Sequence, residues 1–192
     1  MSGWSCGFPD HDAQVADGID ARGRAGLYHG RGIDLLDDRR AGERLSARWQ
    51  PRLLRTARRL TGDADLAMQA AQDSWVAIWR GLPKLRDPAR FGAWAFGILR
   101  RKCADAVGRL VIERQRSGED EAADTAIPPG QEDTAALHEA FAGLSPDHRL
   151  AAHLHFVEGL TLAEIAEVQE VPLGTAKSRL FHARRQLKAA LA

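Results

Sequence analysis

Helix start and stop signals divide the last fifty residues of this 192-residue chain into three short segments. Ser145 is followed by a proline, the order of an N-cap and a first helical residue. Gly159 interrupts the segment that follows, and Thr161–Glu164 has the threonine and glutamate spacing of a capping box. Pro172 opens the last segment. The sequence therefore predicts three helices joined by tight turns, the first ending near Glu158.

The last of these segments has one apolar side and one basic side. Its apolar residues recur at intervals of three and four and predict one buried stripe, made of Leu173, Ala176, Leu180, Ala183 and Leu187. From Gly174 onward there is no acidic residue, and Phe181 lies off the stripe, where it should be exposed to solvent. Such a helix can lie in the major groove of DNA, with its cations near phosphates and its outward face near base edges.

Two interpretations of this helix compete. An amphipathic surface helix with a solvated basic face is common among proteins. DNA binding is favoured here because the capping box, the short turn and the acid-free helix occur together, as they do in a helix-turn-helix.

Charge is strongly segregated along the chain, although the formal net charge is only +1. Residues 46–109 are rich in arginine and lysine, whereas residues 113–133 are acidic and include helix breakers. Two basic blocks joined by an acidic one are typical of two nucleic-acid-facing domains with a solvated tether. The length of the chain allows each domain a small core of its own.

The upstream basic block has helical periodicity throughout. The pattern predicts helices over residues 51–60, 63–81 and 91–109, with a basic loop at 84–90. Asp63 or Asp65 is the candidate N-cap of the second helix. Aromatic residues at helical spacing are expected in the core, namely Trp75, Trp79, Trp94 and Phe96. Phe91 is evenly balanced between a core position and a binding position.

Both basic blocks resemble one protein family. The segments Leu144–Arg149, Glu158–Ala166 and Gly174–Arg184 resemble region 4 of extracytoplasmic-function (ECF) sigma factors, the compact branch of the bacterial sigma-70 family. The segments Gln72–Trp79 and Phe91–Asp105 resemble region 2 of the same family. The resemblance implies an all-α fold of two small helical domains, a region 2 helical bundle and a region 4 helix-turn-helix, joined by a flexible acidic linker.

The implied domain boundaries follow the charge pattern. We expect a disordered N-terminal extension at 1–42, a region 2-like domain at 43–110, the flexible linker at 111–134 and a region 4-like domain at 135–192. The extension is rich in glycine and has little apolar periodicity. No apolar run is long enough for a signal peptide or a membrane span, so we expect a cytoplasmic protein without membrane insertion.

The resemblance also implies a function, partners and binding residues. A sigma factor directs core RNA polymerase to promoters, so the expected partners are promoter DNA, the beta-prime clamp helices and beta flap of polymerase, and an anti-sigma factor; the protein itself should be a monomer. Residues expected to bind the −35 duplex are Thr175, Lys177, Ser178, Arg179, Phe181, His182, Arg184 and Arg185. Residues expected to hold the melted −10 strand are Lys84, Arg86, Arg90, Phe91, Arg100, Arg101 and Lys102. Residues expected to dock on polymerase are Asp63, Asp65, Gln69, Gln72 and Asp73.

Three positions depart from the family pattern. The turn Val168–Val171 lacks the glycine that the family often has, Arg101 stands where asparagine is frequent, and Gln69 stands where an acidic residue is usual. Gln69 predicts a weaker or altered polymerase contact, because charge-assisted pairs are the stronger ones. It also leaves open the alternative that the chain is a sigma-like protein that binds an anti-sigma factor without engaging DNA. A further alternative is a helix-turn-helix regulator that dimerises through the upstream block and binds a palindromic site.

Catalytic and metal-binding functions find little support in the sequence. Cys6 and Cys103 form neither a zinc spacing nor a disulfide framework, and His148, His153 and His155 do not match a ligand spacing. No phosphate loop or nucleophile motif is present. We therefore expect no cofactor, no metal site and no enzymatic activity.

Overall fold

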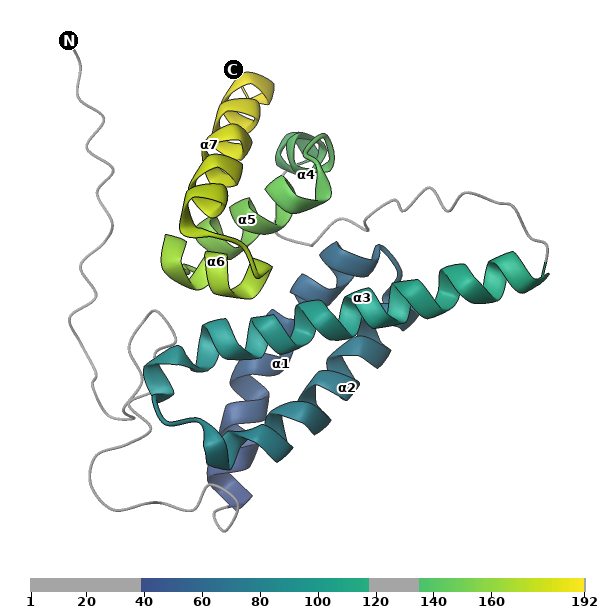
Figure 1. Cartoon of the computed structure of the whole chain (residues 1–192), viewed down its shortest axis with the longest axis vertical. Coiled ribbons are helices and arrows are strands. Elements are labelled where there is room, and N and C mark those ends of the chain that lie inside the picture. Colours follow the sequence, from purple (N-terminus) through teal and green to yellow (C-terminus); the bar gives the residue numbers. More distant parts are fainter. Residues whose placement is uncertain (1–38, 118–134, 192) are drawn as a thin grey trace.

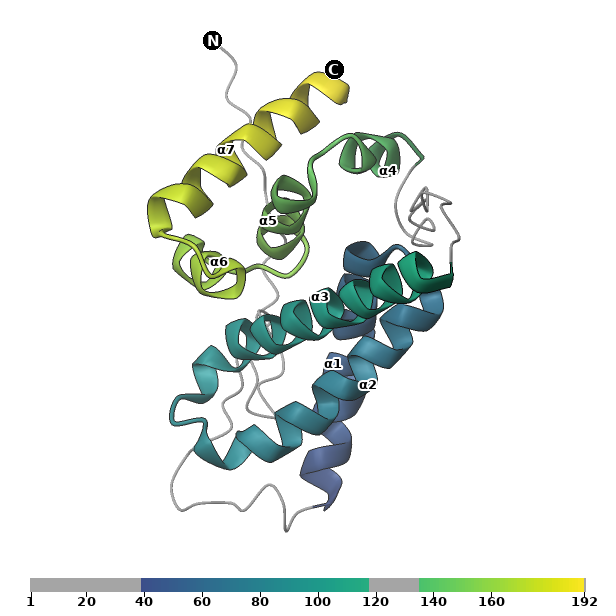
Figure 2. The same cartoon turned by 45° about the vertical axis from the view of Figure 1, so that its right-hand side comes forward.

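The computed structural model describes residues 39–117 and 135–191, and every regular element in these two ranges is a helix. The elements are α1 (Arg39–Thr61), α2 (Ala64–Gly81), the short 3-10 helices η1 (Leu82–Lys84) and η2 (Pro88–Arg90), α3 (Phe91–Ser117), α4 (Ala135–Ala142), α5 (Pro146–Phe156), α6 (Leu162–Gln169) and α7 (Leu173–Ala190). Helices α1 to α3 form one bundle, and α4 to α7 lie together on one side of it (Figure 1 and Figure 2). The predicted all-α fold is confirmed.

Helix α1 is longer than the sequence predicts and runs through Pro51. A proline inside a helix costs about 3 kcal/mol, because it removes one backbone hydrogen bond and crowds the preceding turn. Leu45, Trp49, Leu53 and Ala57, spaced four residues apart, are all buried on one side of α1. Burying each large apolar side chain stabilises the fold by about 1.5–3 kcal/mol, so the packing of this stripe outweighs the proline. The expected helix at 51–60 is therefore only the second half of α1.

The boundaries of α2 and the start of α3 agree with the expected ones, and only the C-terminal end of α3 differs. Asp63 is the N-cap of α2, since its Oδ1 accepts hydrogen bonds from the backbone N–H groups of Asp65 and Leu66, each at 2.8 Å. Helix α3 begins at the expected Phe91 but continues to Ser117, into residues that were expected to belong to the linker. Residues 39–42, which were expected to belong to the disordered extension 1–42, instead form the start of α1. The rest of that extension, 1–38, and the linker residues 118–134 lie outside the described residues.

The predicted caps and the predicted glycine break of the C-terminal helices are confirmed. The Ser145 side chain accepts from the backbone N–H of His148 at the start of α5, and Gly159 has a φ of +73° after its end. The capping box of α6 is complete, because Thr161 and Glu164 each bond the backbone N–H of the other. In α7 the residues Ala176, Leu180, Ala183 and Leu187 are buried. Leu173 is 55% exposed, so its predicted place in the buried stripe is wrong: it stands in the first turn of α7, where the chain is still entering the helix.

The core is shared between the two sets of helices. One continuous cluster of buried side chains includes Leu53 and Phe96 of the first bundle together with Leu154 and Ile165 of the second. A smaller cluster lies under α4, α5 and α7. The chain is long enough for two separate cores, but the larger core is shared between the two sets of helices, because α5 packs on α1 and α6 packs on α3.

The aromatic side chains that were predicted to be core do pack on it. Phe96 is buried, and Trp75, Trp79 and Trp94 are partly buried against the same cluster. Trp49 was not among the expected core aromatics. Its ring lies edge-on to Phe91 at a centroid distance of 4.9 Å and to Phe96 at 5.9 Å. Trp49 therefore anchors α1 against the start of α3.

Candidate nucleic-acid interface

The outward side of α7 presents a basic surface with an aromatic residue in it. Thr175, Lys177, Ser178, Arg184 and Arg185 are exposed, and His182 is half-buried. Phe181 is 61% exposed, as predicted, and its ring lies edge-on to that of His182 at 5.5 Å. No acidic side chain interrupts this surface within α7. We call these residues, together with Phe181, the α7 surface.

The turn that leads into α7 contains a strained residue. Glu170 follows α6 with φ 54° and ψ 46°, in the left-handed region, and its N–H bonds the carbonyls of Ala166 and Glu167. A residue with a Cβ loses about 1–2 kcal/mol in this conformation relative to glycine. The turn is nevertheless tight, and it places α6 against α7 as in a helix-turn-helix.

Arg179 lies on the flank of α7 but binds within the protein. Its guanidinium donates to the Asp147 carboxylate of α5 and, at 3.2 Å, to Oε1 of Gln169 in α6. Gln169 is buried, and its Nε2 donates to the backbone carbonyl of Asp147 at 2.9 Å. Arg179, Asp147 and Gln169 therefore tie α5, α6 and α7 together and fix the angle of the α7 surface.

The surface expected to hold the melted −10 strand lies at the junction of the loop and α3. Lys84, Arg86, Arg90 and Arg101 are exposed, and Arg100 and Lys102 are half-buried. Phe91 is only 1% exposed and packs on Trp49, so its expected contact with DNA does not fit the structure. Its side chain packs in the core and stabilises the start of α3. We call the six cations the α3 surface.

Two acidic residues from the C-terminal half of the chain cover part of the α3 surface. Arg90 donates to Glu167 at 2.6 Å, and Arg101 donates to Glu170 at 2.9 Å. Arg100 lies 3.6 Å from the other oxygen of Glu170. The hydrogen bond from Arg101 lowers the pKa of Glu170, and the hydrogen bond to Glu167 raises the pKa of Arg90. These contacts join residues 69 to 77 positions apart, so no local pattern in the sequence could have predicted them.

The residues expected to dock on polymerase lie mostly on the outer side of α2. Asp65, Gln69 and Gln72 are exposed there, beside the apolar side chains of Met68 and Val76. Two of the acids have other partners. Asp63 uses its carboxylate as the N-cap of α2. Asp73 is half-buried, with Oδ2 3.9 Å from the guanidinium of Arg109.

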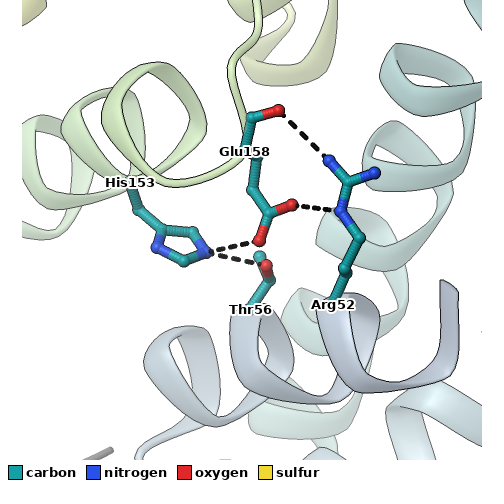
Figure 3. Close-up of polar contacts among 4 residues, drawn as sticks. All are labelled: Arg52, Thr56, His153 and Glu158. Atoms are coloured by element: carbon teal, nitrogen blue, oxygen red, sulfur yellow. Dashed lines mark hydrogen bonds and ion pairs between the residues drawn. The ribbon is translucent and has the colours of Figure 1, made fainter. Parts of the chain in front are cut away.

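A buried polar cluster joins α5 and the loop after it to α1, as Figure 3 shows. Arg52 donates through Nε to Glu158 Oε2 at 2.7 Å and through a terminal nitrogen to the Glu158 backbone carbonyl at 3.1 Å. His153 Nε2 lies 2.9 Å from Thr56 Oγ1 and 3.5 Å from Glu158 Oε1. The side chains of His153 and Glu158 are each only 1% exposed. We call Arg52, Thr56, His153 and Glu158 the latch.

Charge in the latch is carried by Arg52 and Glu158. Burial lowers the pKa of His153 to about 3, and the cations Arg59, Arg55 and Arg52 add to the effect. The imidazole is therefore neutral at pH 7, and its contact with Glu158 is a polar contact of a neutral ring. The Glu158 carboxylate depends on Arg52 for its counter-charge. Losing one partner of a buried pair costs about 3–5 kcal/mol, because the other charge is left without solvent.

Within residues 39–117 and 135–191, no three histidine, cysteine, aspartate or glutamate side chains lie close enough together to hold a metal ion. Burial raises the pKa of the Cys103 thiol to about 12, which keeps it protonated and unreactive. None of the helices in the described part of the chain is both long enough and apolar enough to cross a membrane.

Replacing Arg179 by alanine should destabilise the protein, whereas replacing Arg184 should not. The Arg179→Ala change leaves the buried Gln169 oxygen without its donor, which costs about 1–3 kcal/mol. Arg184 is exposed on the same helix and serves as the matched control. Urea unfolding followed by circular dichroism measures both. Equal stability of the two variants would contradict the role given to Arg179.

Acidification should weaken the fold through His153. The unfolded imidazole binds a proton near pH 6.5 and the folded one only near 3. Between these values the unfolded state holds more protons, so the free energy of unfolding falls as the pH falls, by up to about 1.4 kcal/mol per pH unit. Urea titrations between pH 7.5 and 5 measure the slope. His153→Gln should flatten it and His155→Gln should not; an unchanged slope in His153→Gln would assign the effect elsewhere.

Comparison with known proteins identifies both helical sets. The family model described as Sigma-70 region 2 matches residues 45–110, and the model described as Sigma-70, region 4 matches residues 134–187. The chain is 31% identical over 145 residues to the ECF RNA polymerase sigma factor SigL of Mycobacterium tuberculosis, covering 72% of this chain and 82% of that protein. It is 29% identical over 169 residues to the RNA polymerase sigma-H factor of Pseudomonas aeruginosa, covering 80% and 88%.

Solved structures agree with these matches. The sigma factor RpoE from Bartonella quintana, crystallised with the anti-sigma factor NepR, aligns with a TM-score of 0.67 at 26% identity, over 78% of this chain and 96% of that one. CnrH, in complex with the cytosolic domain of CnrY, aligns with a TM-score of 0.55 at 25% identity, over 80% and 89%. With region 2 and region 4 matched in order and a relative above 30% identity, the chain belongs to the ECF branch of the sigma-70 family of RNA polymerase sigma factors.

Proposed function

We propose that this sigma factor grips its promoters at two points, with the α7 surface on the −35 duplex and the α3 surface on the melted −10 strand. The observation that carries the proposal is the α7 surface itself, an exposed, acid-free set of cations and polar groups around Phe181. The network of Arg179, Asp147 and Gln169 holds that surface at a fixed angle. A fixed recognition helix limits the ordering that binding would otherwise require.

The residues of the α7 surface fall into two groups, one that would contact base edges and one that would contact phosphates. Lys177, Ser178, Phe181 and His182 are placed to meet base edges, with Thr175 at the start of the helix, while Arg184 and Arg185 meet phosphates. Because Arg179 is bonded to Asp147 and Gln169, we assign it to positioning α7 and no longer to phosphate contact.

The α3 surface suits a single strand. Its six cations form a track for the phosphate backbone, which is the main requirement for holding DNA without duplex geometry. The buried Phe91 holds the start of α3 in place and leaves base contacts to other side chains. Arg101 is the most exposed cation of α3 itself in this set and the one best placed to meet an unstacked base.

The partners follow from the same assignment. The outer side of α2, with Asp65, Gln69 and Gln72, docks on the beta-prime clamp helices, and region 4 meets the beta flap. Two solved relatives are held in complexes, RpoE with the anti-sigma factor NepR and CnrH with CnrY, and we propose an anti-sigma partner for this chain too. The protein acts in the cytoplasm as a monomer and catalyses no reaction of its own; polymerase supplies the chemistry.

Run-off transcription with core polymerase tests the proposal. Purified protein and bacterial core polymerase, given a library of genomic fragments from the source organism, should yield transcripts that start downstream of a shared pair of elements. Absence of any specific transcript, together with capture of an anti-sigma protein but no polymerase, would instead identify a sigma-like interaction protein. A palindromic footprint made by a dimer without polymerase would identify a conventional regulator.

Two substitutions on α7 should affect transcription in different ways. Arg184→Ala removes one phosphate contact, so promoter binding by the holoenzyme should weaken uniformly across sequences and the salt slope should fall by about one. Ser178→Ala changes a base-facing group and should alter which −35 sequences are selected. Sequencing the transcripts from a randomised −35 library separates the effects. A change of sequence preference in Arg184→Ala, with an unchanged salt slope, would reverse the roles.

A further inference from the structure

A cavity lies between the C-terminal end of α1 and helix α5, with Val107 of α3 in its wall. Its volume is about 190 Å³, well above the roughly 30 Å³ that one water molecule takes in the liquid. Two arginines line it, Arg59 from α1 and Arg149 from α5, and His153 of α5 lies beside them. None of the described residues that line the cavity is acidic. The cavity therefore combines room for a small anion with positive charge in its wall. We call it the α1–α5 pocket.

Arg149 is held in place by neutral groups. Its Nε donates to the backbone carbonyl of Phe141 at 3.0 Å, and its Nη2 donates to those of Ala142 at 2.7 Å and Leu144 at 2.9 Å. Among the described residues no carboxylate pairs with this guanidinium, and its Nη1 makes no hydrogen bond to any of them. Burial and the like charge of Arg59 lower the pKa of Arg149. An anion in the pocket would offset both effects, and a guanidinium matches the geometry of phosphate oxygens.

His153 adds an unpartnered nitrogen to the same pocket. Its Nε2 faces Thr56 and Glu158, and its Nδ1 lies on the other side of the ring, away from both (Figure 3). The side chain is only 1% exposed, and Nδ1 is buried without a hydrogen-bond partner among the described residues. Buried polar atoms in proteins are nearly always hydrogen-bonded, so this one needs a partner. Because the side chain lines the pocket, an occupant of the pocket could supply the missing bond.

A second atom of the latch is unpartnered in the same way. Glu158 Oε1 is buried without a hydrogen bond from a described residue and lies 3.5 Å from His153 Nε2. A doubly protonated ring would serve both atoms, since Nε2–H would face the carboxylate and Nδ1–H would face an anion. Without an anion, burial and the nearby cations of α1 lower the pKa of His153 to about 3. Those cations are Arg59, Arg55 and Arg52. A bound dianion would raise this pKa, because an opposite charge favours the protonated ring.

We infer that the α1–α5 pocket binds a phosphoryl dianion, held by Arg59, Arg149 and a proton that His153 takes up from solvent as the ligand binds. Three separate donor groups suit a tetrahedral anion better than a carboxylate, which has only two oxygens. The ligand is free phosphate or the terminal phosphate of a small metabolite. No residue of the α7 surface or the α3 surface lines the pocket, so the inference does not depend on the DNA roles proposed for them.

Isothermal titration calorimetry of the full chain with inorganic phosphate and with glycerol 3-phosphate, at constant ionic strength set with NaCl, tests the site. Each should bind saturably with one ligand per chain. Arg59→Gln should weaken binding by about tenfold or more, because it removes one charge-assisted hydrogen bond. Arg58→Gln, an exposed neighbour on the same helix, is the matched control and should change the affinity by no more than about twofold. Circular dichroism of both variants verifies that helix content is retained.

The two ligands distinguish the source of the phosphoryl group. Tighter binding of glycerol 3-phosphate than of phosphate identifies a phosphorylated metabolite, and equal or weaker binding identifies free phosphate. The site is overturned if neither ligand binds saturably, or if Arg58→Gln weakens binding as much as Arg59→Gln. Neither result bears on run-off transcription by the natural chain with core polymerase, which judges the sigma function independently.

Proton uptake is tested with sulfate, which stays a dianion between pH 5 and 8, whereas phosphate itself titrates in this range. The affinity for sulfate should rise as the pH falls, by up to about tenfold per pH unit, because the bound state holds one more proton. Calorimetry in two buffers with different ionisation enthalpies counts the protons taken up. His153→Gln should remove the pH dependence and His155→Gln should keep it. A sulfate affinity that does not change with pH, or a pH dependence that survives in His153→Gln, would overturn the role of His153.

Discussion

A carboxylate that is removed from water must be given a counter-charge, and this requirement fixes how the two halves of the protein meet. Glu158 lies in the loop after α5, almost completely buried, and Arg52 of α1 supplies both the charge and two hydrogen bonds. Arg52 in turn stacks on the ring of Trp49, 4.1 Å from its centroid. The same tryptophan anchors α3 through Phe91. A chain of direct contacts therefore runs from the region 4 loop to the start of the helix that carries the α3 surface.

Local patterns in the sequence predicted those parts of the fold that local energies decide. The N-cap at Ser145, the capping box at Thr161 and the break at Gly159 were all found where expected, because a cap is satisfied within one turn of its own helix. The exposure of Phe181 followed from helical geometry in the same way. The exposed, acid-free side of α7 could thus be predicted from the sequence, with the exception of Arg179.

The sequence-based predictions that proved wrong concern residues whose position depends on contacts with distant parts of the chain. The sequence pattern predicts a helix that begins at Pro51, but the packing of Trp49 and Leu53 stabilises α1 on both sides of this proline. Phe91 could have been a binding residue on pattern alone, and only the position of Trp49 makes it core. Arg179 belongs to the same group of basic residues as Arg184, and it differs by its hydrogen bonds to Gln169 and to Asp147, which is 32 positions away. Glu167 and Glu170 gave no signal, since an acid on a short helix predicts nothing about a partner in another domain.

The left-handed Glu170 has a consequence for protein engineering. A designer who wished to stabilise the isolated helix-turn-helix would replace it by glycine, because that residue adopts this turn without strain. The same replacement deletes the carboxylate that faces Arg100 and Arg101. The thermostability of the isolated helix-turn-helix therefore favours glycine at position 170, whereas the contact between the two halves of the protein favours glutamate. A variant library scored only for the melting temperature of the isolated domain would select against that contact.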